Sequence, residues 1–433
     1  MAESGINQHP SPESASATAY VDALFSQALE QRASDLHLEP QKTGLQIRLR
    51  IDGLLHELPM PPPDIAQRLC ARIKIMARLD IAERRLPQDG RISVKCRGQQ
   101  MDLRVSSLPT LWGEKLVLRI VLQESSILRL KDLGLEESQQ QELVTALAQP
   151  QGLILVTGPT GSGKTLTLYS ALQTLNQGHR NISTAEEPVE IPLVGVNQVA
   201  IKPQIGLTFS STLRALLRQD PDVLMVGEIR DADTASMAIR AAQTGHLVLS
   251  AVHTKSAQAT LVRMRQLGIS NKDLEESVTL VLAQRLLRRL CNRCKIPDKK
   301  TVDQGLKNSG EGGGSPDLTL PNFSGFRANS AGCPGCLGGY QGRLGIFELC
   351  KPTSSNLKCS TLGSSAVHPD TNKSLLGTQD SAISRFVTAP NQSLRAMALR
   401  RYAIGETTLE EIERVLPRTS FTPHIDSTSD LAG

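Results

Sequence analysis

The feature that most restricts this chain is a glycine-rich segment near its middle, Gly158–Thr165, which has the sequence GPTGSGKT. It matches the pattern G-x-x-x-x-G-K-[ST], in which backbone N–H groups and a helix N-terminus surround the same phosphate. The apolar run Leu153–Val156 before it indicates a buried strand, and Leu166–Leu175 after it indicates a helix. Because strand, loop and helix follow in the required order, the segment predicts a chain that binds a nucleoside triphosphate.

Two side chains of the loop have distinct expected tasks. Lys164 is expected to reach the β- and γ-phosphates, and the Thr165 hydroxyl is expected to ligate Mg²⁺. The full set of expected nucleotide contacts in and beside the loop is Gly158, Pro159, Thr160, Gly161, Ser162, Gly163, Lys164, Thr165 and Leu166.

Composition limits the classes of protein to which the chain can belong. It is 39% hydrophobic and 21% charged, as in ordinary globular proteins, and the 3% of aromatic residues argues against base stacking as the main activity. The net charge of +5 permits contact with anionic lipid or nucleic acid without favouring either. No apolar run approaches the roughly 18 residues of a membrane span, and the N-terminus lacks the pattern of a secretory signal. We therefore expect a cytoplasmic protein, in which the eight cysteines do not form a disulfide framework.

Pattern divides the chain into successive parts. Residues 1–17 are rich in Ser, Pro and Glu and are expected to be a disordered tail. Residues 18–130 predict a small α+β domain, and the alternating strands and helices of 131–290 predict an α/β core with a largely parallel sheet. The remaining parts are a four-cysteine segment at 291–350, which a glycine-rich loop at 305–316 interrupts, an irregular insertion at 351–392, and C-terminal helices with a polar tail at 393–433.

Within the N-terminal part, strict alternation indicates a half-buried strand. Leu45, Ile47, Leu49 and Ile51 share one face of this strand. After a run of prolines, apolar residues at helical spacing indicate a helix over about 64–81.

Several acidic and histidine residues follow core strands, where catalytic groups of an α/β protein collect. Glu228 ends the apolar run that begins at Val223, which places it beside the phosphate loop. A second acidic cluster, Glu186-Glu187-Pro188-Val189-Glu190, is equally compatible with a solvated turn. His246 and His253 bracket another strand; one such histidine is usually structural, but the pair favours a sensor of the γ-phosphate.

Four of the cysteines have the spacing of metal ligands. Cys291-x-x-Cys294 and Cys333-x-x-Cys336 are separated by residues 295–332. Either half alone is compatible with a redox pair, but two halves together favour a closed tetrahedral Zn²⁺ site. With all four positions taken by thiolates, the expected metal is structural and not catalytic.

Taken in order, the motifs of the chain resemble those of the secretion ATPase superfamily, and within it the type II secretion and type IV pilus assembly ATPases. The resemblance covers most of 18–346 and resumes at about 394–416. The motifs that carry it are ASDLHLEP, RLRIDG, IAERRLPQDGR, DLRVSSLPT, the phosphate loop, AEEPVE, LRALLRQDPDVLMVGEIRD, TGHLVLSAVHT, the paired cysteines and GRLGIFEL.

The resemblance implies a fold and a set of roles. The core is expected to be RecA-like and the N-terminal domain PAS-like, with ATP bound between them. Glu228 corresponds to the Walker B acid, and Glu186 to the carboxylate that activates water. The family has Asp where this chain has Glu187, which is the second acid of the box. The remaining residues with implied roles are the histidines His246 and His253, the N-terminal arginines Arg91 and Arg104, and the core arginines Arg214 and Arg218.

The function implied is that of a homohexameric ring ATPase peripheral to the inner membrane. ATP-driven closure of the N-terminal domain would act on a membrane platform protein that assembles pilin-like subunits or exports protein. A further N-terminal docking domain, present in many secretion-type members, is not expected here because the arginine-bearing domain starts almost at once.

Three alternatives remain at this point. A pilus retraction motor is disfavoured by the four cysteines, which retraction ATPases generally lack. A zinc-containing nucleic-acid motor is disfavoured because the chain has no concentrated basic stripe, so we expect no nucleic acid partner. A scaffold that does not hydrolyse ATP is suggested by Glu187 and by the unusual segment 351–392.

Overall fold

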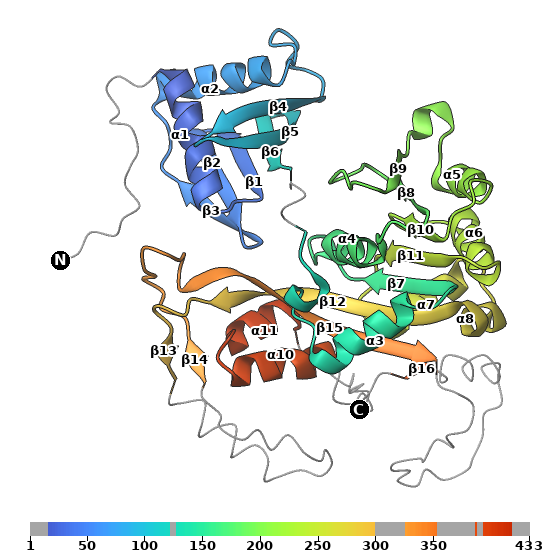
Figure 1. Ribbon diagram of the computed structural model, residues 1–433. Helices are drawn as coiled ribbons and strands as arrows, with labels where there is room; N and C mark the ends of the chain where they lie inside the picture. Colours follow the sequence, from blue (N-terminus) through green and yellow to red (C-terminus); the bar gives the residue numbers. More distant parts are fainter. Residues whose placement is uncertain (1–15, 122–126, 299–324, 353–385, 388–392, 418–433) are drawn as a thin grey trace, which may run out of the picture.

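The computed structural model describes residues 16–121, 127–298, 325–352, 386–387 and 393–417 (Figure 1). Several expectations fall mainly outside these residues: the N-terminal tail 1–17, the glycine-rich loop 305–316, most of the insertion 351–392, and the polar tail after residue 417. No helix within the described ranges has the length and hydropathy needed to cross a bilayer.

The N-terminal part is a six-stranded antiparallel sheet with two helices on one face, on the side away from the core sheet (Figure 1). The strand order is β3-β2-β1-β6-β5-β4. The bounds are α1 (Ala17–Glu30), β1 (Asp35–Gln41), β2 (Gly44–Ile51), β3 (Leu54–Leu58), α2 (Pro63–Met76), β4 (Gln88–Cys96), β5 (Gln99–Thr110) and β6 (Gly113–Ile120).

Alternation along β2 occurs as expected and explains why the sheet has two unlike faces. Leu45, Ile47, Leu49 and Ile51 are buried in the core beneath α1 and α2. The other face is charged, and it includes Arg48, Arg50, Arg91, Arg104 and Arg119 at alternate positions of their strands. This charged face is therefore the one free to meet the rest of the chain.

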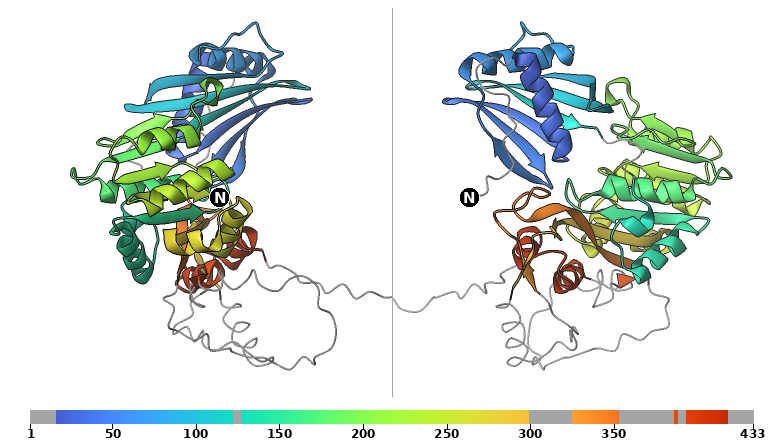
Figure 2. Two further views of the ribbon diagram at one scale, coloured as in Figure 1. Left: turned by 90° about the vertical axis from the view of Figure 1, so that its right-hand side faces the viewer. Right: turned by 60° about the vertical axis from the view of Figure 1, so that its left-hand side comes forward.

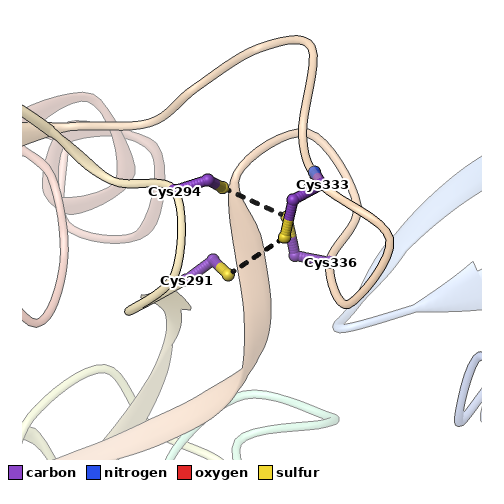
Figure 3. Close-up of side chains that lie close together, drawn as sticks. All are labelled: Cys291, Cys294, Cys333 and Cys336. Carbon is purple, nitrogen blue, oxygen red and sulfur yellow. Dashed lines mark hydrogen bonds between the residues drawn. The ribbon is translucent and has the colours of Figure 1, made fainter. Parts of the chain in front are cut away.

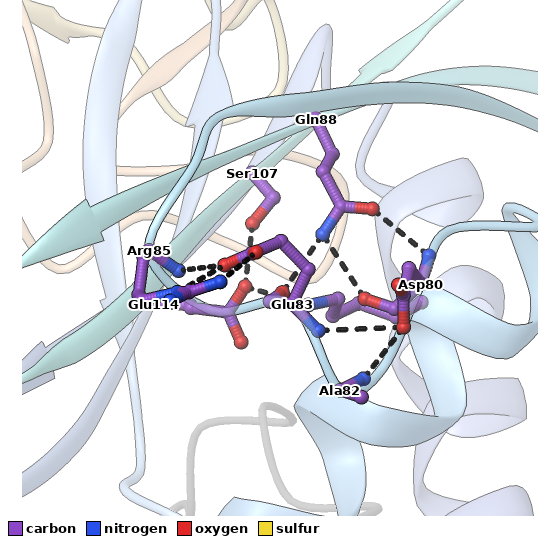
Figure 4. Close-up of polar contacts among 8 residues, drawn as sticks. Asp80, Ala82, Glu83, Arg85, Gln88, Ser107 and Glu114 are labelled. Atoms are coloured by element: carbon purple, nitrogen blue, oxygen red, sulfur yellow. Dashed lines mark hydrogen bonds and ion pairs between the residues drawn. The ribbon is translucent and has the colours of Figure 1, made fainter.

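Helix α2 ends at Met76, five residues before the predicted end at 81. Arg78 has a left-handed φ of 59°, which stops the helix. The following loop is instead ordered by polar contacts (Figure 4): Asp80 accepts the N–H groups of Ala82 and Glu83, and the Gln88 amide donates to two loop carbonyls. The fully buried Lys74 ammonium completes the network by contacting Glu114 and the Glu83 carbonyl oxygen at 2.7 and 2.8 Å. The apolar periodicity of 77–81 thus belongs to a loop.

The core is an eight-stranded sheet of order β16-β15-β12-β7-β11-β10-β8-β9 (Figure 1). The run from β12 to β9 is parallel, as predicted, and the two strands beyond β12 are antiparallel. The bounds are β7 (Gly152–Thr157), β8 (Ile182–Glu186), β9 (Asn197–Ala200), β10 (Val223–Val226), β11 (Leu247–Val252), β12 (Val278–Leu290), β15 (Tyr340–Pro352) and β16 (Phe386–Val387).

Helices cover both faces of this sheet, and alternate residues of each strand reach opposite cores. Leu153 and Leu155 of β7 pack in one core with helices α5–α8, α10 and α11, whereas Ile154 and Val156 pack in the other with α3 and α4. The bounds are α3 (Glu137–Leu147), α4 (Lys164–Leu175), α5 (Phe209–Leu216), α6 (Ala232–Gln243), α7 (Ala257–Gln266), α8 (Asn271–Ser277), α10 (Leu394–Ala403) and α11 (Leu409–Val415). Short 3₁₀ turns are η2 (Leu130–Asp132) and η3 (Pro203–Ile205).

The cysteine-bearing segment is continuous with this sheet. β12 leads directly into Cys291, the short strands β13 (Ile296–Pro297) and β14 (Phe326–Arg327) pair with each other, and β15 returns beside β12. Figure 2 shows this long hairpin running from the core towards the N-terminal sheet. There Leu337 packs against the N-terminal core, and Asp52 of the β2–β3 turn accepts the Gly342 N–H at 2.8 Å.

The C-terminal helices are tied to the same hairpin by a buried carboxylate. Glu411 on α11 is fully buried and accepts hydrogen bonds from the backbone and guanidinium of Arg288, both at 2.9 Å, and from Arg414. Burial raises the pKa of Glu411, but hydrogen bonds from Arg414 and Arg288 outweigh burial, so its pKa is lowered. Arg288 also stacks 3.9 Å above the Tyr340 ring of β15.

We predict that Glu411→Ala destabilises the protein by about 3 kcal/mol, because it leaves the largely buried Arg288 guanidinium and the Arg288 backbone N–H without their acceptor. The matched control is Glu410→Ala, which removes an exposed neighbour and should change stability by less than about 0.5 kcal/mol. Urea unfolding followed by circular dichroism measures both. Equal midpoints for the two variants would refute this role of Glu411.

Candidate active site

The phosphate loop connects the end of β7 to the start of α4, as predicted. A Cβ at Gly158 would lie 2.6 Å from the Gln284 carbonyl oxygen and 2.5 Å from the Ser162 hydroxyl, so only glycine fits there. Gly163 has a left-handed φ of 90°, which glycine adopts at little cost. The Gln284 amide of β12 donates to the Ser162 carbonyl at 2.6 Å. The loop thus rests on β12, a contact that its sequence did not indicate.

Lys164 is buried inside its own loop. Its ammonium donates to the carbonyl oxygens of Gly158 and Pro159 at 2.8 and 3.1 Å and lies 3.5 Å from His253 Nδ1. Burial lowers the pKa of Lys164 to about 8, and the nearby Glu228 carboxylate opposes this shift. Thr165 follows Lys164 in the first turn of α4, and its side chain is exposed.

Glu228 and His253 meet because they follow the neighbouring parallel strands β10 and β11. His253 Nε2 lies 3.3 Å from a Glu228 carboxylate oxygen. The pKa of His253 is lowered, first by burial and then by the positive charge of Lys164. An imidazole that stays neutral at pH 7 is able to accept or donate a hydrogen bond at a bound phosphate.

The acids of the 186–190 box point in different directions. Glu186 is only 3% exposed and accepts hydrogen bonds from the Tyr169 hydroxyl, from Thr184 at 2.6 Å and from Gln198 at 3.0 Å. Glu187 is partly exposed instead, and it lies 3.4 Å from the Arg230 guanidinium, which also pairs with Glu228. The structure therefore places Glu187 on the side of Glu228 and holds Glu186 among buried partners.

Arginines of the N-terminal sheet face this box. Arg91 and Arg104 lie opposite each other on β4 and β5, and both line a cavity of about 520 Å³ that also reaches Pro188. Arg104 donates to the Val189 carbonyl oxygen at 2.9 Å and lies 3.1 Å from Glu190. Arg104 thus contacts the acidic box directly, and Arg91 lies beside it on the adjacent strand and lines the same cavity.

Three other predicted residues lie elsewhere. His246 precedes β11, at the end of the sheet opposite the phosphate loop, and contacts the Ala241 carbonyl of α6 at 3.0 Å. The two histidines are thus a full strand apart, and a paired sensor does not form within this chain. Arg214 and Arg218 are exposed at α5, where Arg218 donates to the Arg214 carbonyl. In the described ranges, no hydrogen bond or ion pair joins them to Lys164, Glu228 or Glu187.

Sequence reasoning missed three residues of the site: Tyr169, Arg230 and Gln284. Tyr169 and Gln284 carry no motif signal, since their contacts depend on how α4 and β12 pack. Arg230 had one available signal, because it lies two residues after Glu228 and so projects from the same strand end.

The four cysteines form one cluster at the end of the β12–β15 hairpin (Figure 3). All four sulfur atoms lie within 4.8 Å of one another, and the Cys291–Cys333 and Cys294–Cys336 pairs are 3.7 and 3.5 Å apart. Sulfur atoms around a tetrahedral Zn²⁺ ion lie roughly 3.8 Å apart, given Zn–S bonds near 2.3 Å. A backbone hydrogen bond from Gly335 lowers the pKa of the Cys333 thiol to about 7, whereas burial raises the pKa of the Cys294 and Cys336 thiols. The cluster therefore fits a metal ion.

The environment of Glu186 yields a testable difference between the two acids. We predict that Glu186→Ala lowers the free energy of unfolding by about 3 kcal/mol, because the buried Tyr169 and Thr184 hydroxyls and the partly buried Gln198 amide lose their acceptor. Glu187→Ala should cost less than about 1 kcal/mol, since its ion pair is solvent-exposed. Thermal and urea unfolding of the nucleotide-free protein measure both. An equal loss from both substitutions would contradict the different placement of these acids.

Comparison with known proteins places this geometry in a family. A family model described as "Type II/IV secretion system protein" matches residues 11–414. The type IV pilus assembly ATPase PilB of Acinetobacter baylyi is 45% identical over 92% of this chain and 66% of its own length. The type II secretion system protein E of Dickeya dadantii is 42% identical over 91% of this chain and 74% of its own.

A solved structure agrees at the level of the fold. The ATPase DotB of Yersinia pseudotuberculosis is 23% identical, with a TM-score of 0.55 over 65% of this chain and 79% of its own. This supports the RecA-like core that the motifs implied. The chain spans about two thirds of the length of the PilB relatives that it matches. The family model nevertheless covers nearly all of it, and the chain belongs to the type II/IV secretion system protein family.

Proposed function

We propose that this chain hydrolyses ATP and uses the energy to drive assembly of pilin-like subunits or export of protein. The observation that carries the proposal is the position of Arg91 and Arg104. These arginines belong to a separate sheet, yet they line a cavity that reaches Pro188 of the acidic box, and Arg104 donates to the Val189 carbonyl oxygen of that box. Hydrolysis needs such positive charge on the transferring phosphoryl group in addition to a phosphate loop.

The loop and its neighbours receive these roles. Backbone N–H groups of 158–165 and the Lys164 ammonium hold the phosphates, which requires the ammonium to leave the carbonyl oxygens of Gly158 and Pro159. Thr165 and Glu228 are the residues that would hold Mg²⁺, which neutralises charge on the β- and γ-phosphates when bound. His253 senses the γ-phosphate from its position beside Lys164 and Glu228.

The acidic box supplies the carboxylate that orients the attacking water. Glu186 remains the proposed residue by resemblance, although in this structure Tyr169 and Gln198 hold its carboxylate. To act on water it must exchange those partners when the nucleotide binds. Arg214 and Arg218 likewise reach a phosphate only through movement of α5, or across a contact between subunits of the ring.

In this proposal, each of the two sheets belongs to a part of the chain with its own role. Residues 18–130 form the arginine-bearing domain and residues 131–290 the ATPase core, and closure of one on the other accompanies ATP binding. Six copies arranged in a ring, on the cytoplasmic side of the inner membrane, would pass this movement to a platform protein. The assembly or export direction is supported over retraction by relatives named for pilus assembly and type II secretion.

The four cysteines hold a structural Zn²⁺ ion in this proposal. Every ligand position is taken by a thiolate, so the metal stabilises the end of the β12–β15 hairpin and does not touch the substrate. Contact with nucleic acid plays no part in the proposal.

The proposal is tested by measuring phosphate release from ATP by the purified full chain. We expect turnover that falls at least about 100-fold in Lys164→Ala, which removes positive charge from the phosphates, and in Glu228→Gln, which weakens the hold on the Mg²⁺ that supplies such charge. Arg91→Ala and Arg104→Ala should lower turnover while ATP binding persists. A parent turnover near zero, with Glu186→Gln no slower, would support the scaffold alternative, and stimulation by DNA would support a nucleic-acid motor.

A separate prediction concerns the metal. Purified protein should contain one equivalent of zinc by mass spectrometry, and Cys333→Ser should lose most of it together with several degrees of melting temperature. Cys96→Ser is the matched control, because Cys96 is a buried thiol of the N-terminal core outside the cluster. It should keep the zinc. Full zinc content in Cys333→Ser would exclude the predicted ligand set.

A further inference from the structure

The Arg230 guanidinium lies between the carboxylates of Glu187 and Glu228, and it has no assigned role. The Arg230 guanidinium contacts Glu228 through one nitrogen and lies 3.4 Å from Glu187 through another. Arg230 follows Glu228 by two residues, and Glu187 follows β8, so the bridge spans the ends of two adjacent strands. Its partners therefore come from the Walker B segment and from the acidic box.

Around Glu187 and Glu228, the negative charge of the carboxylates is closely balanced by positive charge. Glu228 is 13% exposed and Glu187 is 32% exposed, so leaving both carboxylates unpaired would be costly in the absence of a cation. His253 contacts the second oxygen of Glu228, at 3.3 Å, and does not reach Glu187 in any contact of the described residues. The ammonium of Lys164 is directed at loop carbonyls. Arg230 is thus the cation in direct contact with both acids.

The Arg230 side chain is also able to move away from the two carboxylates. Its side chain is 63% exposed, so it can swing into solvent without opening a cavity in the core. Its backbone carbonyl is held separately, since it accepts a hydrogen bond from Arg263 at 3.4 Å. The side chain can therefore move while the strand end stays in place.

We propose that Arg230 is a positioning residue that substitutes for the divalent cation in the nucleotide-free state, holding Glu187 and Glu228 together until the metal arrives with the nucleotide. Arg230 and the metal then compete for the same carboxylate oxygens. The inference deepens the proposed function and rests on its assignment of Glu228 to the metal.

The test uses Mn²⁺ alone as the probe, with the zinc-loaded, nucleotide-free full chain. Bound Mn²⁺ loses its sharp electron paramagnetic resonance signal, so titration gives its dissociation constant without any turnover. Arg230→Gln should bind Mn²⁺ at least about threefold more tightly than the parent, because the competing charge is gone. Arg230→Lys keeps a cation there and should stay within about twofold of the parent. Arg240→Gln, an exposed arginine on α6, is the matched control for loss of one charge and should equal the parent.

A second substitution identifies where the ion binds. Adding Glu228→Gln to Arg230→Gln should abolish the gain in Mn²⁺ affinity. An unchanged or weaker affinity in folded Arg230→Gln would overturn the inference, as would a gain that survives Glu228→Gln, because the ion would then bind elsewhere. Absence of ATP turnover in the parent would contradict the proposed function. The Mn²⁺ titration tests the role of Arg230 independently of turnover.

Discussion

The arrangement depends on charge gathered at the carboxyl ends of parallel strands. Glu187, Glu228 and His253 follow β8, β10 and β11, and Lys164 follows β7 through the phosphate loop. A contact chain runs from Lys164 through His253 and Glu228 to Arg230 and Glu187. In it, Arg230 lies between two carboxylates, and Lys164 already donates to the carbonyl oxygens of its own loop. A bound triphosphate must therefore replace existing partners.

The second sheet completes this balance from outside the core. Its apolar face is occupied by α1 and α2, which leaves the charged face directed at the acidic box. Arg104 already contacts Val189 and Glu190. Carboxylates and phosphates attract the same guanidinium groups, so an arginine that pairs with the box is near the place where phosphate charge would attract it.

Much of this was predictable from sequence where one strong local rule applied. The phosphate loop and the alternation in β2 follow from spacing, because each depends on residues close in the chain. The parallel core and the four-cysteine cluster join distant segments, but each segment carries its own recognisable pattern, the alternation of strands with helices or a C-x-x-C pair. The end of α2 was mispredicted because a buried lysine and a left-handed Arg78 outweighed apolar periodicity. The direction of Glu186, the isolation of His246 and the bridging by Arg230 depend on packing between distant segments, which one sequence does not reveal.

One strand has a consequence for how ligands of the whole chain influence each other. β12 supports the phosphate loop through Gln284, and it ends at Leu290, directly before Cys291 of the four-cysteine cluster. The cluster loop in turn touches the N-terminal sheet through Leu337 and Gly342. If a metal ion bound at the cysteines raised the affinity for nucleotide through this strand, bound nucleotide would raise the affinity for the metal ion by the same factor. Two ligands that never meet would thus share a single coupling energy through one rigid element.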